Sequence, residues 1–153
     1  MKINKKVLCT MIMTGAVMMC TNIANAAGIG YIELSKVLKN YTYAQQISTE
    51  VKNKDIEIQK FMTEANQKIN NAKSPVEKKN LEQKYSAEFK AKLTAFQDYQ
   101  VDKQKEVENN IINAVKLVAK EQKLDAVFTS GVLLYGGVDI SGNVVLKLNS
   151  LKK

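Results

Sequence analysis

The chain has 153 residues, of which 45% are hydrophobic and 25% charged, and its 23 basic and 15 acidic residues give a net charge of +8. Every basic residue is a lysine, and the sequence contains no histidine. Nucleic-acid-reading proteins rely on arginine for bidentate contacts, and acid–base and zinc chemistry most often use histidine. This composition therefore argues against nucleic acid as a partner and against an enzyme.

The first 26 residues are typical of a secretory signal peptide. Lysines at the start precede an apolar stretch over residues 7–19, and Ala24-Asn25-Ala26 follows the small-x-small pattern of a cleavage site. The apolar stretch is shorter than the roughly 20 residues that a membrane-spanning helix needs. We predict export and cleavage between Ala26 and Ala27. The alternative is a lipoprotein signal with Cys20 as the lipidated residue, although the preceding Met19 is not small.

Cleavage at this position would change the chemistry of the exported chain. It removes Cys9 and Cys20, the two cysteines of the sequence, so no disulfide can form. It also removes three lysines, which lowers the net charge from +8 to +5. The remaining positive charge favours solubility and attraction to anionic surfaces or acidic polypeptides. The exported chain must therefore be stabilised by packing or by assembly.

Two long helices are predicted in the middle of the chain. Apolar residues recur every seven positions from Ala44 to Ala72, a coiled-coil-like pattern that Lys54 and Lys68 interrupt. The pattern resumes at Leu81 and continues to about Glu121, with a polar patch at residues 97–104 that we interpret as a hinge. The last part of the second helix is its most apolar part, which indicates that this end is buried in a body.

The single proline, Pro75, lies between the two helices. Ser74 and Glu77 have the spacing of a capping box, in which Ser74 is the N-cap and Pro75 occupies the first helical position. A residue before proline resists helical geometry, so the first helix should end by about Lys73. The short connection predicts an antiparallel hairpin with its tip at residues 73–75; one kinked helix is the alternative.

Short strands are predicted at both ends of the exported chain. Residues 28–34 read as a strand followed by a helical turn, and residues 124–130 and 131–137 read as two strands joined at Ser130-Gly131. The tail from Val138 is either a strand or a short helix capped by Asp139 or Ser141. So few strands cannot enclose a core of their own, and exposed sheet edges favour aggregation, so we expect the body to oligomerise.

Three stretches resemble the Skp/OmpH family of periplasmic chaperones: GIGYIELSKVLKNY, AVKLVAKEQKLDAVF and LYGGVDISGNVVLKLN. In the last stretch, Asp139, Ile140, Ser141, Val144, Leu148 and Asn149 match the closing pattern of the family. The resemblance covers essentially the whole exported chain, although the family commonly mixes arginine with lysine on its arms and this chain has none. It implies a closing helix rather than a strand.

The resemblance implies a periplasmic homotrimer in which strands of three subunits form the body and three hairpins enclose a cavity. This cavity would hold unfolded outer-membrane proteins without ATP. The expected fold is thus α+β, with a helical hairpin over residues 44–104 projecting from a body formed by residues 27–43 and 105–153 and completed by trimerisation. No cofactor and no metal are expected. The alternatives are a structural coiled-coil protein of the envelope and a cationic protein that binds lipopolysaccharide or anionic lipid.

The candidate site residues fall into two groups. Apolar and cationic residues of the arm are the candidates for client binding: Phe61, Met62, Tyr85, Phe89, Leu93, Phe96, Lys68, Lys73, Lys78 and Lys79. Apolar residues of the strands and helix ends are the candidates for the trimeric body: Ile29, Tyr31, Ile111, Val115, Val118, Val127, Leu134, Ile140 and Leu148.

Overall fold

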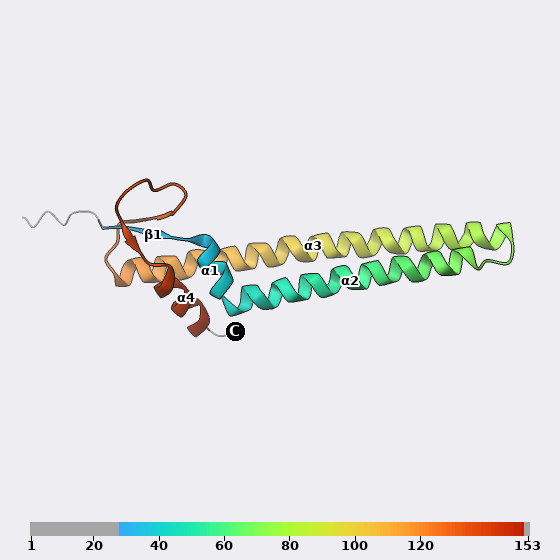
Figure 1. Ribbon diagram of the computed structural model, residues 1–153, viewed down its shortest axis with the longest axis horizontal. Coiled ribbons are helices and arrows are strands. Elements are labelled where there is room, and N and C mark those ends of the chain that lie inside the picture. Colours follow the sequence, from blue (N-terminus) through green and yellow to red (C-terminus); the bar gives the residue numbers. More distant parts are fainter. Residues whose placement is uncertain (1–27, 152–153) are drawn as a thin grey trace, which may run out of the picture.

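The structure, a computed structural model, describes residues 28–151, and Figure 1 shows a long two-helix hairpin extending from a small body. The elements in chain order are β1 (Ile29–Ile32), α1 (Leu34–Asn40), α2 (Thr42–Asn70), α3 (Pro75–Glu121), β2 (Ala126–Thr129), β3 (Val138–Asp139) and α4 (Ser141–Ser150). This architecture confirms an α+β fold with a helical hairpin. The predicted signal peptide and its cleavage site at Ala26 and Ala27 lie outside the described residues.

The turn between α2 and α3 confirms the hairpin and excludes the kinked helix. The Oγ atom of Ser74 accepts a hydrogen bond from the backbone N–H of Glu77, at 3.1 Å. The Glu77 carboxylate in turn accepts from the backbone N–H of Lys73, at 2.8 Å. The glutamate therefore reaches one residue further back than in a standard capping box, and it orders the tip as well as the helix start.

The body contains a three-stranded sheet in which both outer strands run parallel to the central β1, in the order β2-β1-β3. Tyr31 of β1 lies opposite Phe128 of β2 and Asp139 of β3. The prediction of two strands joined at Ser130-Gly131 is wrong in its second half. Residues 131–137 form a loop, and the next strand has only two residues.

This loop returns the chain to the other side of β1, so that β3 can run parallel to it (Figure 1). Gly136 and Gly137 both have positive φ angles, 82° and 87°, which side chains other than glycine rarely adopt. Gly137 lies against β1, where a Cβ atom would be 3.3 Å from the Ile29 carbonyl oxygen. The glycines reverse the chain, which a regular strand over these residues would not allow.

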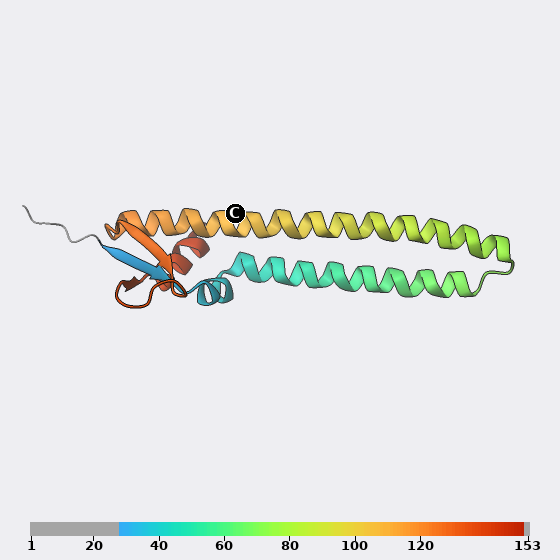
Figure 2. The ribbon, with the colours of Figure 1, turned by 90° about the horizontal axis from the view of Figure 1, so that it is seen from above.

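The body has a hydrophobic core of its own, contrary to our expectation from the number of strands. Its buried residues come from β1, from α1 and the start of α2, from the last third of α3, and from α4: Ile32, Val37, Tyr41, Ile47, Val107, Ile111, Ala114, Val118, Ile140, Val144 and Leu148. The prediction failed because it left α1 and α4 out of the core. Figure 2 shows α4 lying beside the body end of α3.

Helix α4 confirms the helical alternative for the tail. Ile140, Val144 and Leu148 lie on one face of it and are buried. At its start, the Asp139 carboxylate accepts hydrogen bonds from the N–H and hydroxyl groups of Ser141. The hydroxyl of Ser141, which is fully buried, accepts from the backbone N–H of Glu33 at 2.8 Å. This network connects α4 to the end of β1.

Candidate functional site

The apolar candidates of the arm lie along the contact between α2 and α3. The rings of Phe61 and Tyr85 meet edge to face with centroids 5.9 Å apart. These two rings, like Phe89 and Phe96, are half-buried between the helices. Met62 and Leu93 are the exposed members of the set, at 43% and 36%. The arm thus keeps a weakly packed apolar seam whose edges reach solvent.

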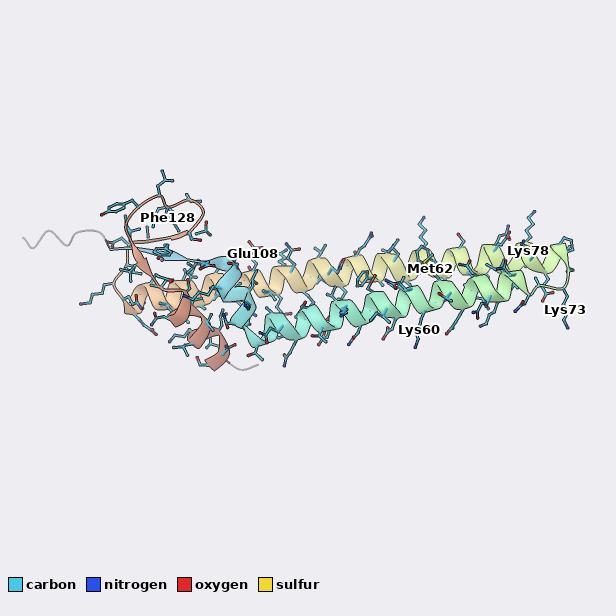
Figure 3. All side chains as sticks on the ribbon, viewed as in Figure 1. Lys60, Met62, Lys73, Lys78, Glu108 and Phe128 are labelled. Carbon is cyan, nitrogen blue, oxygen red and sulfur yellow. The ribbon has the colours of Figure 1, made fainter. Side chains whose placement is uncertain are left out.

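Beside the seam, Phe61, Met62, Tyr85 and Phe89 also line a shallow groove of about 210 Å³, together with Ala65, Asn66, Ile69, Glu82 and Ser86. The labelled Met62 lies about midway along the hairpin in Figure 3. Methionine adapts its shape to irregular partners. The groove therefore combines aromatic rings with an adaptable thioether side chain on one exposed face of the arm.

Lysine ammonium groups lie near the aromatic rings of the arm. Lys92 is 5.1 Å from the ring centroid of Phe61, and Lys68 and Lys84 are 5.9 and 5.8 Å from that of Tyr85. Such contacts contribute about 0.5–1 kcal/mol each at exposed sites. Lys68, a predicted site residue, is thus part of the aromatic cluster. Cationic and aromatic groups are presented side by side.

The positive charge is concentrated in the outer half of the hairpin. Residues 60–92 carry eight lysines and four glutamates, whereas the rest of the described chain carries ten lysines and eleven acidic residues. Lys73, Lys78 and Lys79 are exposed at or beside the tip, and Figure 3 labels the first two there. The hairpin therefore has a cationic end that projects away from a nearly neutral body.

The polar patch at residues 97–104 is held to α2 by a network that the sequence interpretation missed. Lys103 Nζ donates to the hydroxyl of Tyr43 at 3.2 Å and pairs with the carboxylate of Glu106 at 2.9 Å. The Tyr99 hydroxyl donates to the carboxylate of Glu50. These hydrogen bonds raise the pKa of Tyr99 and, chiefly through Glu106, that of Lys103. Because α2 and α3 are antiparallel, Tyr43 and Glu50 of α2 lie opposite Lys103 and Tyr99 of α3. Pairing the two helices from the turn at Ser74 could therefore have predicted the network from the sequence.

The body candidates separate into two sets. Four of them are buried in the core of this same chain: Ile111, Val118, Ile140 and Leu148. The other five are partly or fully exposed: Ile29, Tyr31, Val115, Val127 and Leu134. Leu134 is fully exposed at 102%, and its neighbour Tyr135, which was not among the candidates, is exposed at 96%. The loop 131–137 thus presents large apolar groups to solvent.

Two further hollows occur in the body. A groove of about 340 Å³ lies between α3 and β2, with Ile112, Val115, Leu124, Val127 and Phe128 in its lining. A pocket of about 400 Å³ lies where α2, α3 and α4 meet, lined by Tyr41, Thr42, Tyr43, Gln46, Asn110, Asn113, Leu148, Asn149 and Leu151. Sequence reasoning identified neither, since both need the packing of distant segments.

The described residues hold neither a candidate metal site nor a helix suited to cross a membrane. Residues 28–151 contain no cluster of three or more acidic residues arranged to hold a metal ion. None of their helices has the length and apolar character required to cross a membrane.

Comparison with known proteins gives one family. A family model described as outer membrane protein (OmpH-like) matches residues 28–148. A search of curated proteins finds no significant match. Among solved structures, a protein of Caulobacter crescentus described as an OmpH-like outer membrane chaperone is similar, with 17% identity, a TM-score of 0.36, and coverage of 81% of this chain and 85% of that one. Because the family model spans most of its length, this chain belongs to the OmpH-like (Skp) family.

Proposed function

We propose that this chain is an ATP-independent chaperone of the periplasm that binds unfolded outer-membrane proteins between its arms and prevents their aggregation. The observation that carries the proposal is the outer half of the hairpin, where a net positive charge surrounds a half-exposed aromatic seam. Membership of the OmpH-like family supports the same function.

The arm suits a chaperone that holds clients of unrelated sequence. Its apolar contacts are shallow and scattered, so that each one contributes little binding energy and none demands a particular client residue. Its lysines attract acidic segments over a distance of roughly 8–10 Å at physiological salt, and salt should weaken this attraction. Many weak contacts of this kind hold a client while still allowing its release without ATP.

We further propose that three copies assemble through their bodies. Val132, Leu134 and Tyr135 project from the loop, and the apolar groove between α3 and β2 is open on another part of the same chain. Seating the loop of one copy in the groove of the next is a head-to-tail contact, and such contacts form a closed ring when the rotation between neighbouring copies is a whole fraction of a turn. Three is the number that the family resemblance implies, and three arms around one axis would enclose a cavity.

Binding of lipopolysaccharide or anionic lipid is a second candidate function. The excess of lysine at the hairpin tip favours it, because anionic headgroups would meet the most cationic part of the described chain first. The third alternative is a purely structural coiled-coil protein. Such a protein would gain nothing from positive charge and exposed apolar edges in the outer half of the hairpin. The chaperone function accounts for both features together.

The decisive experiment dilutes an unfolded outer-membrane barrel protein from urea into buffer with or without the exported chain, and follows light scattering at low and high salt. We expect a stoichiometric amount of trimer to suppress scattering, and to do so less effectively at high salt. Unchanged scattering at low salt would refute the chaperone function. Vesicles with and without anionic lipid, tested separately for sedimentation with the chain, decide the second candidate.

A further inference from the structure

The pocket lined by residues of α2, α3 and α4 lies far from the cationic tip, because these helices come together at the end of the hairpin that joins the body (Figure 1). Its volume of about 400 Å³ falls within the range of about 300–1,000 Å³ that ligand pockets occupy. A quarter of the residues in the chain are charged, yet none of the nine lining residues is. The uncharged lining of the pocket therefore differs from the surface of the arm, which is rich in lysine.

The floor and the rim of the pocket have different chemistry. Tyr41 and Leu148 are buried at its base, and Tyr43 is half-buried beside them. Gln46 and Asn113 are exposed at its edges. In the part of the chain that the structure describes, the side-chain amides of Gln46 and Asn113 have no hydrogen-bond partner. Each amide carries two donors and one acceptor.

The other amides of the lining already have structural roles. Asn149 accepts from the backbone N–H of Thr42 at 3.0 Å and donates to the carbonyl of Asn40 at 3.0 Å. Asn110 donates to the hydroxyl of Tyr41 at 3.2 Å. These bonds hold the three helices together around the pocket. Among the side-chain amides of the lining, Gln46 and Asn113 are therefore the two that remain available to a ligand.

We propose that this pocket binds a short, uncharged, extended stretch of polypeptide, whose backbone pairs with Gln46 and Asn113 while an apolar side chain packs on Tyr43 and Leu148. A peptide backbone offers one donor and one acceptor per residue, which side-chain amides match whatever the sequence. A carbohydrate offers hydroxyl groups for the amides and a C–H face for Tyr43, but it has no aliphatic side chain to pack on Leu148. Polypeptide is therefore the ligand that uses both parts of the pocket.

This inference rests on the proposed chaperone function and adds a second kind of contact to it. The 29 residues of α2 span about 43 Å, so the pocket and the tip are well separated points of attachment for one client. Simultaneous weak contacts at separated points raise the overall affinity without a strong contact anywhere. Contacts at the tip are electrostatic and weaken with salt, whereas contacts in the neutral pocket should not.

The test compares a pocket variant, Gln46→Ala with Asn113→Ala, with a matched control, Gln104→Ala with Asn109→Ala, which removes two exposed amides of α3 outside the pocket. Binding of a labelled unfolded outer-membrane barrel protein is titrated at high salt. We expect the pocket variant to bind about tenfold more weakly than the wild type, which corresponds to two hydrogen bonds of about 0.5–1 kcal/mol each. The control variant should bind like the wild type.

A direct readout uses side-chain amide signals in nuclear magnetic resonance spectra of the wild-type chain. A blocked, uncharged hexapeptide of alternating serine and valine should shift the signals of Gln46 and Asn113 but not those of Gln104 and Asn109. Equal client affinity of both variants, or shifts caused by a neutral dextran fragment and not by the peptide, would overturn the inference. If the wild type binds no client at all, the chaperone function fails, while the peptide titration still tests the pocket.

Discussion

The contact between α4 and β1 gives a sharp prediction about the stability of the body. Ser141→Ala removes a fully buried hydroxyl that accepts from the backbone N–H of Glu33 and donates to the carboxylate of Asp139. The Glu33 N–H then has no acceptor in a part-buried position, and leaving such a donor unsatisfied costs about 1–3 kcal/mol. We therefore expect the free energy of unfolding to fall by that amount.

The measurement is urea unfolding followed by far-UV circular dichroism, at one protein concentration because assembly adds to apparent stability. The matched control is Ser130→Ala, which alters an exposed serine at the end of β2 and should change stability by less than about 0.5 kcal/mol. If Ser141→Ala were as stable as this control, the network would not hold α4 on the body.

Three further predictions concern the body and the tip. Hydrogen bonds from Ser141 and the nearby Lys36 lower the pKa of Asp139 in the folded chain below the ordinary value of 3.8. The stability that this carboxylate contributes is thus complete above pH of about 5, and it is lost as the pH falls below 3.8 and through the lower pKa of the folded chain. The stability difference between wild type and Asp139→Asn should therefore shrink during acid titration, and a constant difference would contradict this. Gly137→Ala places a Cβ on a residue with φ of 87° and should cost about 1–3 kcal/mol in urea unfolding, whereas Gly142→Ala, in α4 and in open space, should not destabilise the chain. Ser74→Ala removes the N-cap of α3 and should cost about 0.5–2 kcal/mol locally, seen as faster hydrogen exchange over residues 77–79, with exchange in the body unchanged.

Local sequence signals predicted the hairpin well. Ser74, Pro75 and Glu77 act within one turn, so their spacing alone located the end of one helix and the start of the next. The heptad pattern placed the seam, and the contact of Phe61 with Tyr85 in the structure agrees with the register that a turn near Ser74 implies. These features depend on residues that are close in sequence or related by one simple reversal.

The features that sequence did not predict depend on contacts between distant segments. Glu33 and Ser141 are 108 positions apart, and nothing local marks them as partners. Leu134 and Tyr135 follow an apolar pattern that suggests a strand, but two glycines with positive φ make the segment a loop. The uncharged pocket lined by Tyr43, Asn113 and Leu148 likewise forms only when α2, α3 and α4 pack together.

The measurement that tests the central claim most directly is the mass in solution of the exported chain, alone and after addition of an unfolded outer-membrane barrel protein. The account predicts a trimer by itself, and a soluble complex of three chains with one client after mixing. A chain that stays monomeric, or a client that aggregates while the chain remains free, would contradict it.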